Sequence, residues 1–155
     1  MLTRIVASYE ANPQLQQELM QEVALALWQS LPRFRGDGSQ KAFIARVAQN
    51  RCISHVGREA RRPRQTELDE RMPADHASAE EQLSDAQRRA ALMAAVRDLP
   101  LNLRQVTTLA LEGFSHREIA DALGISENNA MVRFSRAKAA LKKALAPPKK
   151  ASDQG

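Results

Sequence analysis

Apolar residues recur every three or four positions along most of this chain, which is the spacing of helices that bury one face. The first such segment covers residues 2–10. The next begins after Asn12-Pro13, a pair typical of an N-cap followed by proline in the first helical turn, and it ends at Pro32. We expect this second helix to bury a wide apolar stripe, which consists of Leu15, Leu19, Met20, Val23, Leu27, Trp28 and Leu31.

A loop with two glycines, residues 33–39, precedes a third helix predicted at about 41–61. The inner positions of that helix are expected to be Phe43, Ile44, Val47, Ala48, Cys52 and Val56. Its outer face is basic and is opposed only by Glu59. The basic residues of this face are Lys41, Arg46, Arg51, Arg58, Arg61 and Arg62.

The helical period stops at Pro63. Two prolines occur between residues 63 and 79, and acidic residues outnumber basic ones there, so we predict a flexible linker. A helix resumes near residue 80 and ends at Leu99-Pro100, and another covers residues 101–112 before Gly113. The tail, residues 147–155, is low in complexity and is expected to be disordered.

The segment from Ser115 to Ser126 predicts a helix-turn-helix motif. Ser115 and Glu118 have the spacing of a capping box at the start of a short helix. Gly124 suits the left-handed turn that ends this helix, and Ala120 is small enough for two helices to cross closely. Ser126 then caps a longer helix, predicted at 127–145. A generic helical hairpin is the alternative to a DNA-binding motif.

The last helix has one apolar and one polar side. Its inner stripe is expected to be Ala130, Phe134, Ala137 and Leu141. Asparagine and arginine at the start of such a helix can read base edges in the major groove, and basic residues further along can neutralise phosphates. The candidate contacts are Ser126, Glu127, Asn128, Asn129, Arg133, Arg136 and Lys138. Arg136 or Lys138 could equally be solvated surface.

The distribution of charge favours a polyanionic partner. The net charge is +5, but residues 1–62 and 101–155 each carry +4, whereas residues 63–100 carry −3. Two basic blocks separated by an acidic stretch suggest two nucleic-acid-binding units joined by a segment that avoids nucleic acid.

Composition narrows the chemistry. With 43% apolar and 26% charged residues the chain should fold, and 4% aromatic residues with abundant Ala, Leu and Glu favour helices. The longest uncharged run, residues 23–32, is too short to span a bilayer. One cysteine and three scattered histidines give neither a disulfide nor a metal cluster, and we expect His55 and His116 at the surface. The chain is therefore expected to be cytoplasmic, with no metal, cofactor or small-molecule substrate.

Two separate blocks of sequence resemble one family. The run from Gly113 to Asn129, followed by Val132–Lys138, is similar to region 4 of bacterial extracytoplasmic-function sigma factors of the sigma-70 family. Glu18–Val23 with Trp28 resembles the region 2 helix "DLVQEVF…W" of these factors. Phe34–Asp37 and Ala42–Asn50 resemble their "FRGD-S-FRAWLYRIARN" segment.

The resemblance implies an all-α protein with a region 2-like bundle (1–62), a flexible linker (63–79), a region 4-like helix-turn-helix domain (80–146) and a tail (147–155). Core RNA polymerase would bind Glu18, Gln21 and Glu22. The melted −10 element would contact Gly36, Asp37, Ser39, Lys41, Arg46, Asn50, Arg51 and Arg58. The double-stranded −35 element would contact the candidates on the last helix, and an anti-sigma factor is a further conceivable partner.

The chain departs from the family pattern in three places. Phe43 stands where Trp is usual, and Met131 and Val132 replace the commoner Lys-Ser. The first helix is shorter than usual, which predicts an apolar face of the bundle that its own helices leave uncovered.

Two other functions fit less of the sequence. A stand-alone helix-turn-helix regulator that binds an operator without polymerase would explain residues 101–145 but not 18–62. A small helical enzyme lacks support, because the sequence offers no nucleophile–base pair, paired catalytic carboxylates or phosphate loop.

Overall fold

The computed structural model describes residues 1–36, 38–62 and 84–147, and every secondary-structure element in these ranges is helical. The all-α prediction is therefore confirmed. The linker predicted at 63–79 and the tail from residue 148 lie outside the described residues. The elements are α1 (Leu2–Ala7), α2 (Pro13–Ser30), the 3₁₀ turn η1 (Leu31–Arg33), α3 (Gln40–Arg61), α4 (Asp85–Arg97), α5 (Leu101–Leu111), α6 (His116–Leu123) and α7 (Glu127–Leu145).

Local sequence sets most of the helix ends. Asn12 caps α2 through its side-chain oxygen, which accepts a hydrogen bond from the Gln14 amide at 2.9 Å, and Pro13 fills the first turn. Ser84 begins α4 with a capping box that includes Gln87. These caps satisfy backbone N–H groups that a helix start otherwise leaves without partners.

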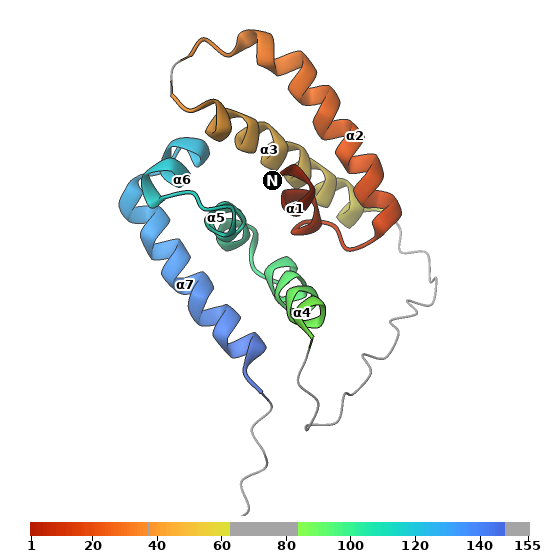
Figure 1. Cartoon of the computed structure of the whole chain (residues 1–155), viewed down its shortest axis with the longest axis vertical. Coiled ribbons are helices and arrows are strands. Elements are labelled where there is room, and N and C mark those ends of the chain that lie inside the picture. The colour runs from red at the N-terminus through yellow and green to blue at the C-terminus, as the bar shows by residue number, and fades with distance from the viewer. Residues whose placement is uncertain (37, 63–83, 148–155) are drawn as a thin grey trace, which may run out of the picture.

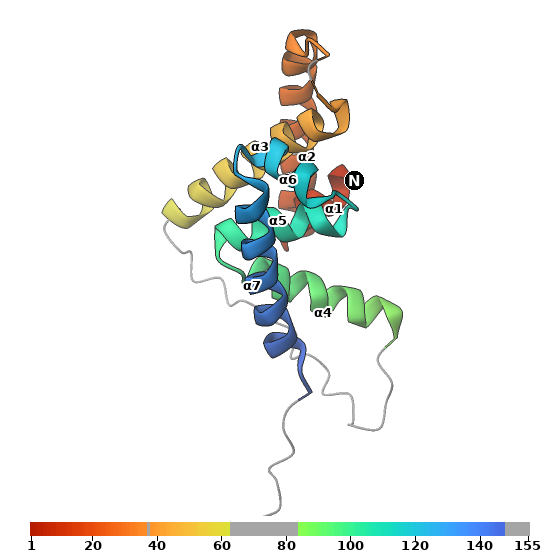
Figure 2. The same cartoon turned by 90° about the vertical axis from the view of Figure 1, so that its left-hand side faces the viewer.

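The helices form two layers that pack against each other (Figures 1 and 2). In the first layer α2 and α3 lie side by side, and α1 packs on both of them. In the second layer α7 packs against α4, α5 and α6. The two layers meet where α6 packs on α3, close to the start of α3.

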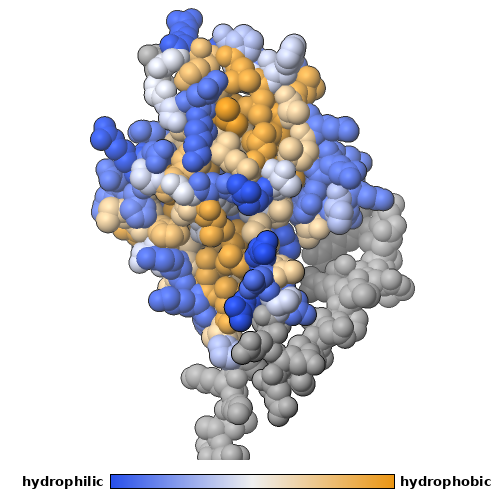
Figure 3. All heavy atoms as spheres, viewed as in Figure 1, coloured by the Kyte–Doolittle hydropathy of each residue, from blue (hydrophilic) through white to orange (hydrophobic). Residues whose placement is uncertain are grey.

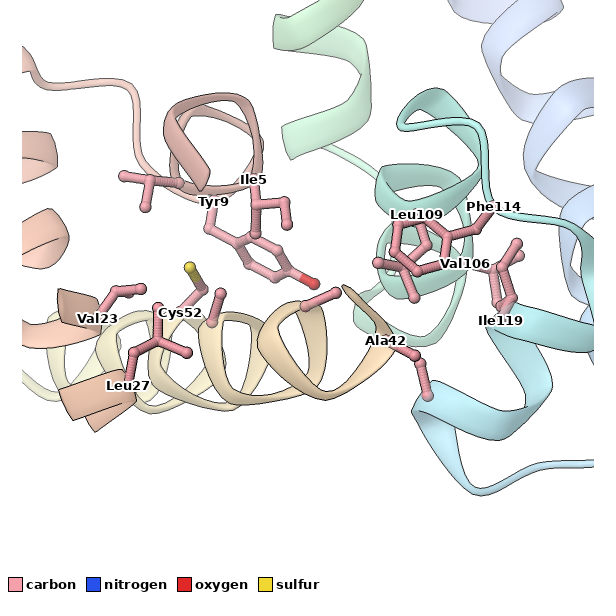
Figure 4. Packing of buried hydrophobic residues seen from close by; sticks show 14 of the residues in the cluster. Ile5, Tyr9, Val23, Leu27, Ala42, Cys52, Val106, Leu109, Phe114 and Ile119 are labelled. Carbon is pink, nitrogen blue, oxygen red and sulfur yellow. The ribbon is translucent and has the colours of Figure 1, made fainter. Parts of the chain in front are cut away.

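One hydrophobic core extends across both layers. Ile5 and Tyr9 near α1, Val23 of α2 and Cys52 of α3 belong to the same buried cluster as residues of the second layer. Figure 4 shows Ala42 of α3 close to Ile119, and the Tyr9 ring between α1 and α3. The second-layer members of the cluster are Val106, Leu109, Phe114, Ile119, Ala120, Ala122 and Ala130.

The apolar face that residues 1–62 were expected to leave uncovered packs into this shared core. The first helix is indeed short, but α5 brings Val106 and Leu109, both 0% exposed, into the cluster that contains Ile5 and Tyr9. Helices distant in sequence thus complete the bundle, because burying the face against α5 removes apolar surface from water. The sequence pattern of residues 1–62 alone contains no sign of this partner.

A buried polar network joins the layers as well. The Tyr9 hydroxyl donates to the side-chain oxygen of Gln49, which is 1% exposed. The Gln49 amide nitrogen in turn donates to the backbone carbonyl of Gln105, at 2.9 Å. The Thr108 hydroxyl lies 3.2 Å from that of Ser8, and both residues are buried. Polar groups buried in this way are tolerated because each has a partner.

His55 is buried, so the expectation that it lies at the surface is wrong. It is 6% exposed, and its Nε2 lies 2.7 Å from Oε1 of Glu10, in the segment between α1 and α2. The sequence around His55 does not reveal this, because the partner, Glu10, lies 45 residues earlier in the chain. His116 is half-buried, with its ring centre 5.7 Å from that of Phe134.

Candidate nucleic-acid interface

The helix-turn-helix motif has the predicted geometry. The Ser115 hydroxyl accepts from the Glu118 amide at 3.1 Å, and the Glu118 carboxylate accepts from the Ser115 amide at 2.9 Å. This bonding lowers the pKa of Glu118. Gly124 adopts the left-handed conformation, with φ of +68°, and the Ile125 amide bonds back to the carbonyl of Ala120.

The outer face of α7 presents the candidate −35 contacts together. Ser126 is the N-cap, and its hydroxyl accepts a hydrogen bond from the Asn129 amide at 3.0 Å. Its side chain therefore stabilises the start of α7. The inner positions Ala130 and Ala137 are 0% exposed, as the stripe predicted. The candidates on the opposite face that are exposed to solvent are Glu127, Asn128, Arg136 and Lys138.

Two of the α7 candidates interact with each other. Arg133 is half-buried, and its Nε donates to Oδ1 of Asn129 at 3.0 Å. This bond holds the side-chain oxygen of Asn129, which is also half-buried, against Arg133 one turn further along the helix. Lys138 has its Nζ 5.1 Å from the Phe134 ring centre, and Arg136 is exposed.

The candidate −10 contacts lie along α3 and the loop before it. Gly36 is exposed with φ of +79°, a conformation that favours glycine, and Asp37 lies outside the described residues. Ser39 caps α3, its hydroxyl accepting from the Ala42 amide at 3.3 Å. The α3 candidates that are exposed are Lys41, Arg46, Asn50, Arg51 and Arg58.

A shallow cavity of about 230 Å³ lies beside Asn50. Arg46 and Phe43 line it from α3, and Ser30 and Arg33 line it from the end of α2 and from η1. A hollow with an aromatic wall, an amide and two guanidinium groups is suited to an unstacked base and its phosphates. Arg33 was not among the residues predicted from the sequence, because only the turn after α2 brings it near Asn50.

Of the three candidate polymerase contacts, two are exposed and the third forms an ion pair within the chain. Glu18 and Gln21 are exposed on α2. Glu22 accepts a hydrogen bond from Nη2 of Arg58 at 2.6 Å, which ties α2 to α3. Arg58 is therefore engaged with a carboxylate in this structure as well as being a candidate phosphate contact.

Trp28 is not part of the buried stripe, which corrects the sequence prediction. Its side chain is 79% exposed, and Leu25 is 57% exposed, whereas Leu27 is only 8% exposed. Glu18, Gln21, Leu25 and Trp28 follow each other at intervals of three or four residues, so they share one face of α2. We call these four residues the α2 outer face. The sequence shows these intervals, but it does not separate Trp28 from the neighbouring apolar stripe.

Leu31 is also outside the buried core, at 38% exposed. Hydrophobic side chains gather in two strips on the face shown in Figure 3, one between α2 and α3 and one between α4 and α7. Hydrophilic side chains border both strips. Apolar surface with a polar border is typical of protein contact sites.

Cys52 is buried as predicted, and burial raises the pKa of its thiol to about 12, so it is unreactive at neutral pH. Among the described residues no group of His, Cys, Asp and Glu could hold a metal ion. No helix in the described ranges is long and apolar enough to cross a membrane.

An all-helical chain with a helix-turn-helix motif in one layer and a basic helix and loop in the other defines a class of DNA-binding protein. Comparison with known families narrows this class. Residues 1–62 match the family described as Sigma-70 region 2, and residues 81–141 match Sigma-70, region 4. The RNA polymerase sigma-H factor of Pseudomonas aeruginosa is 28% identical over 153 residues, covering 92% of this chain and 79% of that protein.

Two solved structures share the fold. RpoE of Bartonella quintana, in complex with the anti-sigma factor NepR, has a TM-score of 0.68 at 21% identity over 93% of this chain and 89% of its own. CnrH, in complex with the cytosolic domain of CnrY, has a TM-score of 0.66 at 21% identity, with coverage of 93% and 79%.

The chain belongs to the sigma-70 family, as a sigma factor of the extracytoplasmic-function type. It binds core RNA polymerase and directs promoter-specific initiation of transcription. The family consists of initiation factors, and a stand-alone operator-binding regulator is not favoured, because that function leaves the region 2 match unexplained.

Proposed function

We propose that this sigma factor contacts its promoter through two separate surfaces. The outer face of α7 enters the major groove at the −35 element, and α3 with its preceding loop holds the melted strand at the −10 element. The observation that carries this proposal is the exposure of Asn128, Arg136 and Lys138 on α7 together with Arg46 and Asn50 on α3. Because these basic and amide side chains are exposed, they are available to contact phosphates and base edges.

We assign core polymerase to the α2 outer face. An exposed tryptophan beside an exposed leucine is costly to leave in water and is typical of the centre of a protein interface. Glu18 and Gln21 border these two side chains on the same helix and supply a polar rim. Glu22 contributes through its pair with Arg58, by holding α2 against α3. A cytoplasmic site of action follows from binding polymerase.

An anti-sigma factor is the further partner that we propose. RpoE and CnrH, which share this fold, were each solved with a protein of that kind or its cytosolic domain. The hydrophobic strips of Figure 3 offer apolar surface on which such a partner could bury helices.

Run-off transcription with core polymerase tests the proposed function. Core enzyme alone should give no promoter-specific transcript, and adding the chain should give one from promoters enriched by binding to the reconstituted holoenzyme. A chain that binds a duplex operator but never makes specific initiation depend on its presence would be a stand-alone regulator. Glu18→Lys should reduce core binding without loss of helicity. Glu59→Lys, near the end of α3, makes the same change in charge away from the α2 outer face and is the matched control.

A further inference from the structure

One apolar side chain lies at the centre of the polar outer face of α7. Val132 is 40% exposed, and it is two residues from both Ala130 and Phe134 of the inner stripe. Since each residue turns an α-helix by about 100°, Val132 points away from that stripe. The residues one turn before it and one turn after it are all polar. They are Asn128, Asn129, Ser135 and Arg136.

The stability of the domain does not explain this valine. A β-branched residue is a weaker helix former than the straight-chain residues that usually occupy exposed helix positions. The core takes its fully buried side chains on α7 from the opposite side of the helix, where Ala130 and Ala137 are both 0% exposed. The apolar surface of Val132 is therefore available to a partner outside the chain.

The apolar surface at this point is too small for a protein partner. Met131, the adjacent apolar residue, is 48% exposed and lies on the flank of the same face. Stable protein interfaces bury about 800 Å² on each partner, which two side chains among amides and a guanidinium group do not provide. Such a surface instead fits a polar partner that carries an isolated apolar group.

The major groove of DNA contains a group of this kind. Base edges there present hydrogen-bond donors and acceptors, and among the four bases thymine alone adds a methyl group, at C5. Asn128 and Arg136 are exposed beside Val132 and can bond to base edges and phosphates. The valine side chain can neither donate nor accept a hydrogen bond, so the thymine methyl group is the base substituent that it can contact favourably.

The start of α7 holds Val132 in a defined position. The Ser126 hydroxyl accepts a hydrogen bond from the Asn129 amide at 3.0 Å, which fixes the first turn of the helix. Nε of Arg133, the residue after Val132, donates to the side-chain oxygen of Asn129 at 3.0 Å. Valine itself has one strongly preferred χ1 rotamer in a helix. Little conformational freedom is therefore lost when a base covers its methyl groups.

We propose that Val132 makes this chain select thymine at one position of the −35 element, by packing its methyl groups against the C5-methyl group of that base. The proposal rests on the placement of α7 in the −35 major groove. Val132 is also one of the positions at which the chain departs from the family pattern, in which serine is commoner. A serine hydroxyl contacts a base edge through hydrogen bonds, whereas valine contacts only a methyl group, so the substitution changes which base fits.

Deoxyuridine tests the contact, because uracil keeps the O4 acceptor of thymine and lacks only the methyl group. The probes are duplex promoters enriched by binding to the reconstituted holoenzyme, in which deoxyuridine replaces one thymine of the −35 element at a time. At one position the holoenzyme should bind about fourfold more weakly, as expected when one methyl group is no longer buried. If no single replacement weakens binding, Val132 does not read thymine and the proposal is wrong.

Two variants assign the contact to Val132. Val132→Ser removes both methyl groups from an exposed position, so its holoenzyme should bind the thymine and deoxyuridine promoters equally. Leu145→Ser is the matched control, because Leu145 is 43% exposed at the end of the same helix, and this variant should retain the difference. Circular dichroism of the free chains checks that both variants keep their helicity. A difference that persists in Val132→Ser, or that disappears equally in Leu145→Ser, would overturn the proposal.

Transcription and a phosphate-contact variant separate this proposal from the function on which it rests. A holoenzyme that initiates specifically but does not distinguish thymine from deoxyuridine keeps the function and refutes the role of Val132. If Arg136→Ala also leaves promoter binding and its salt dependence unchanged, the placement of α7 in the groove is wrong as well. A chain that supports no specific transcription refutes the proposed function, and the role of Val132 with it.

Discussion

Arg4 of α1 and Glu112, at the end of α5, form a two-pronged ion pair between the two layers of helices. Nε of Arg4 lies 2.6 Å from Oε1 of Glu112, and Nη2 lies 2.9 Å from Oε2. The arginine is largely exposed, whereas the carboxylate is only 6% exposed. The planar guanidinium and carboxylate groups form two parallel hydrogen bonds, which fix their relative orientation. The pair thus joins two residues that are 108 positions apart in the sequence.

This pair predicts that the free energy of unfolding depends on pH. The hydrogen bond from Arg4 lowers the pKa of Glu112 below its ordinary value. A carboxyl group with a lowered pKa in the folded state contributes stability above its unfolded pKa, and that stability is lost as the pH falls through the folded pKa. Glu112→Gln should therefore lower the free energy of unfolding at neutral pH and have progressively less effect below about pH 4.

Urea unfolding of the parent, Glu112→Gln, Arg4→Gln and the double variant at several pH values provides the measurement. The two single effects should overlap at neutral pH, because either change removes the same pair. Fully additive effects of the two substitutions would show that the residues do not interact in solution.

Gln49 should be more important for stability than its neighbour. Gln49→Ala removes the partner of the buried Tyr9 hydroxyl and of the Gln105 carbonyl, so we expect a loss of about 1–3 kcal/mol in the free energy of unfolding. Asn50→Ala changes the exposed residue beside it on α3 and should change stability by less than about 0.5 kcal/mol. Chemical denaturation measures both, and similar losses would contradict the network.

Trp28 and Leu27 should have opposite effects. Trp28→Ala truncates an exposed side chain, so stability should change by less than about 0.5 kcal/mol, while binding to core polymerase should weaken by about 2 kcal/mol or more. Leu27→Ala should instead cost about 2–5 kcal/mol of stability, because it leaves a cavity in the core. Binding of labelled protein to core enzyme, with thermal unfolding in parallel, separates the two. Unchanged core binding by the Trp28 variant would remove polymerase from the α2 outer face.

Arg133 and Arg136 should differ in what they contribute to −35 recognition. Arg136→Ala should weaken binding to all sequences and lower the salt slope by about one unit, as expected for a phosphate contact. Arg133→Ala releases the Asn129 amide and should relax the preference at one promoter position by about 1–3 kcal/mol. Holoenzyme binding to promoter libraries at several salt concentrations distinguishes the two effects. If neither substitution alters affinity, preference or salt slope, α7 does not enter the groove as proposed.

The linear pattern of residues was enough to predict the helices and most of their ends. Asn12-Pro13, the Ser115–Glu118 capping box and Gly124 act through bonds within a few residues, so a linear pattern is enough to locate them. The same holds for the inner stripe of α7 and the basic side of α3, because helical period alone separates their faces. The family followed from these local motifs in their order along the chain.

Which helix faces are covered depends on how the helices pack, and this could not be predicted from the local sequence. The period of α2 allows Trp28 to be counted with the buried stripe, but none of the described helices packs over it, and it remains exposed. The sequence predicts His55, a polar residue, at the surface, but it is buried and lies within hydrogen-bond distance of Glu10. Lys41 has the same local signal as the other basic residues of α3, and only its approach to Phe114 distinguishes it. Such contacts join residues far apart in the chain, and burial depends on which surfaces pack together, a property that no local pattern contains.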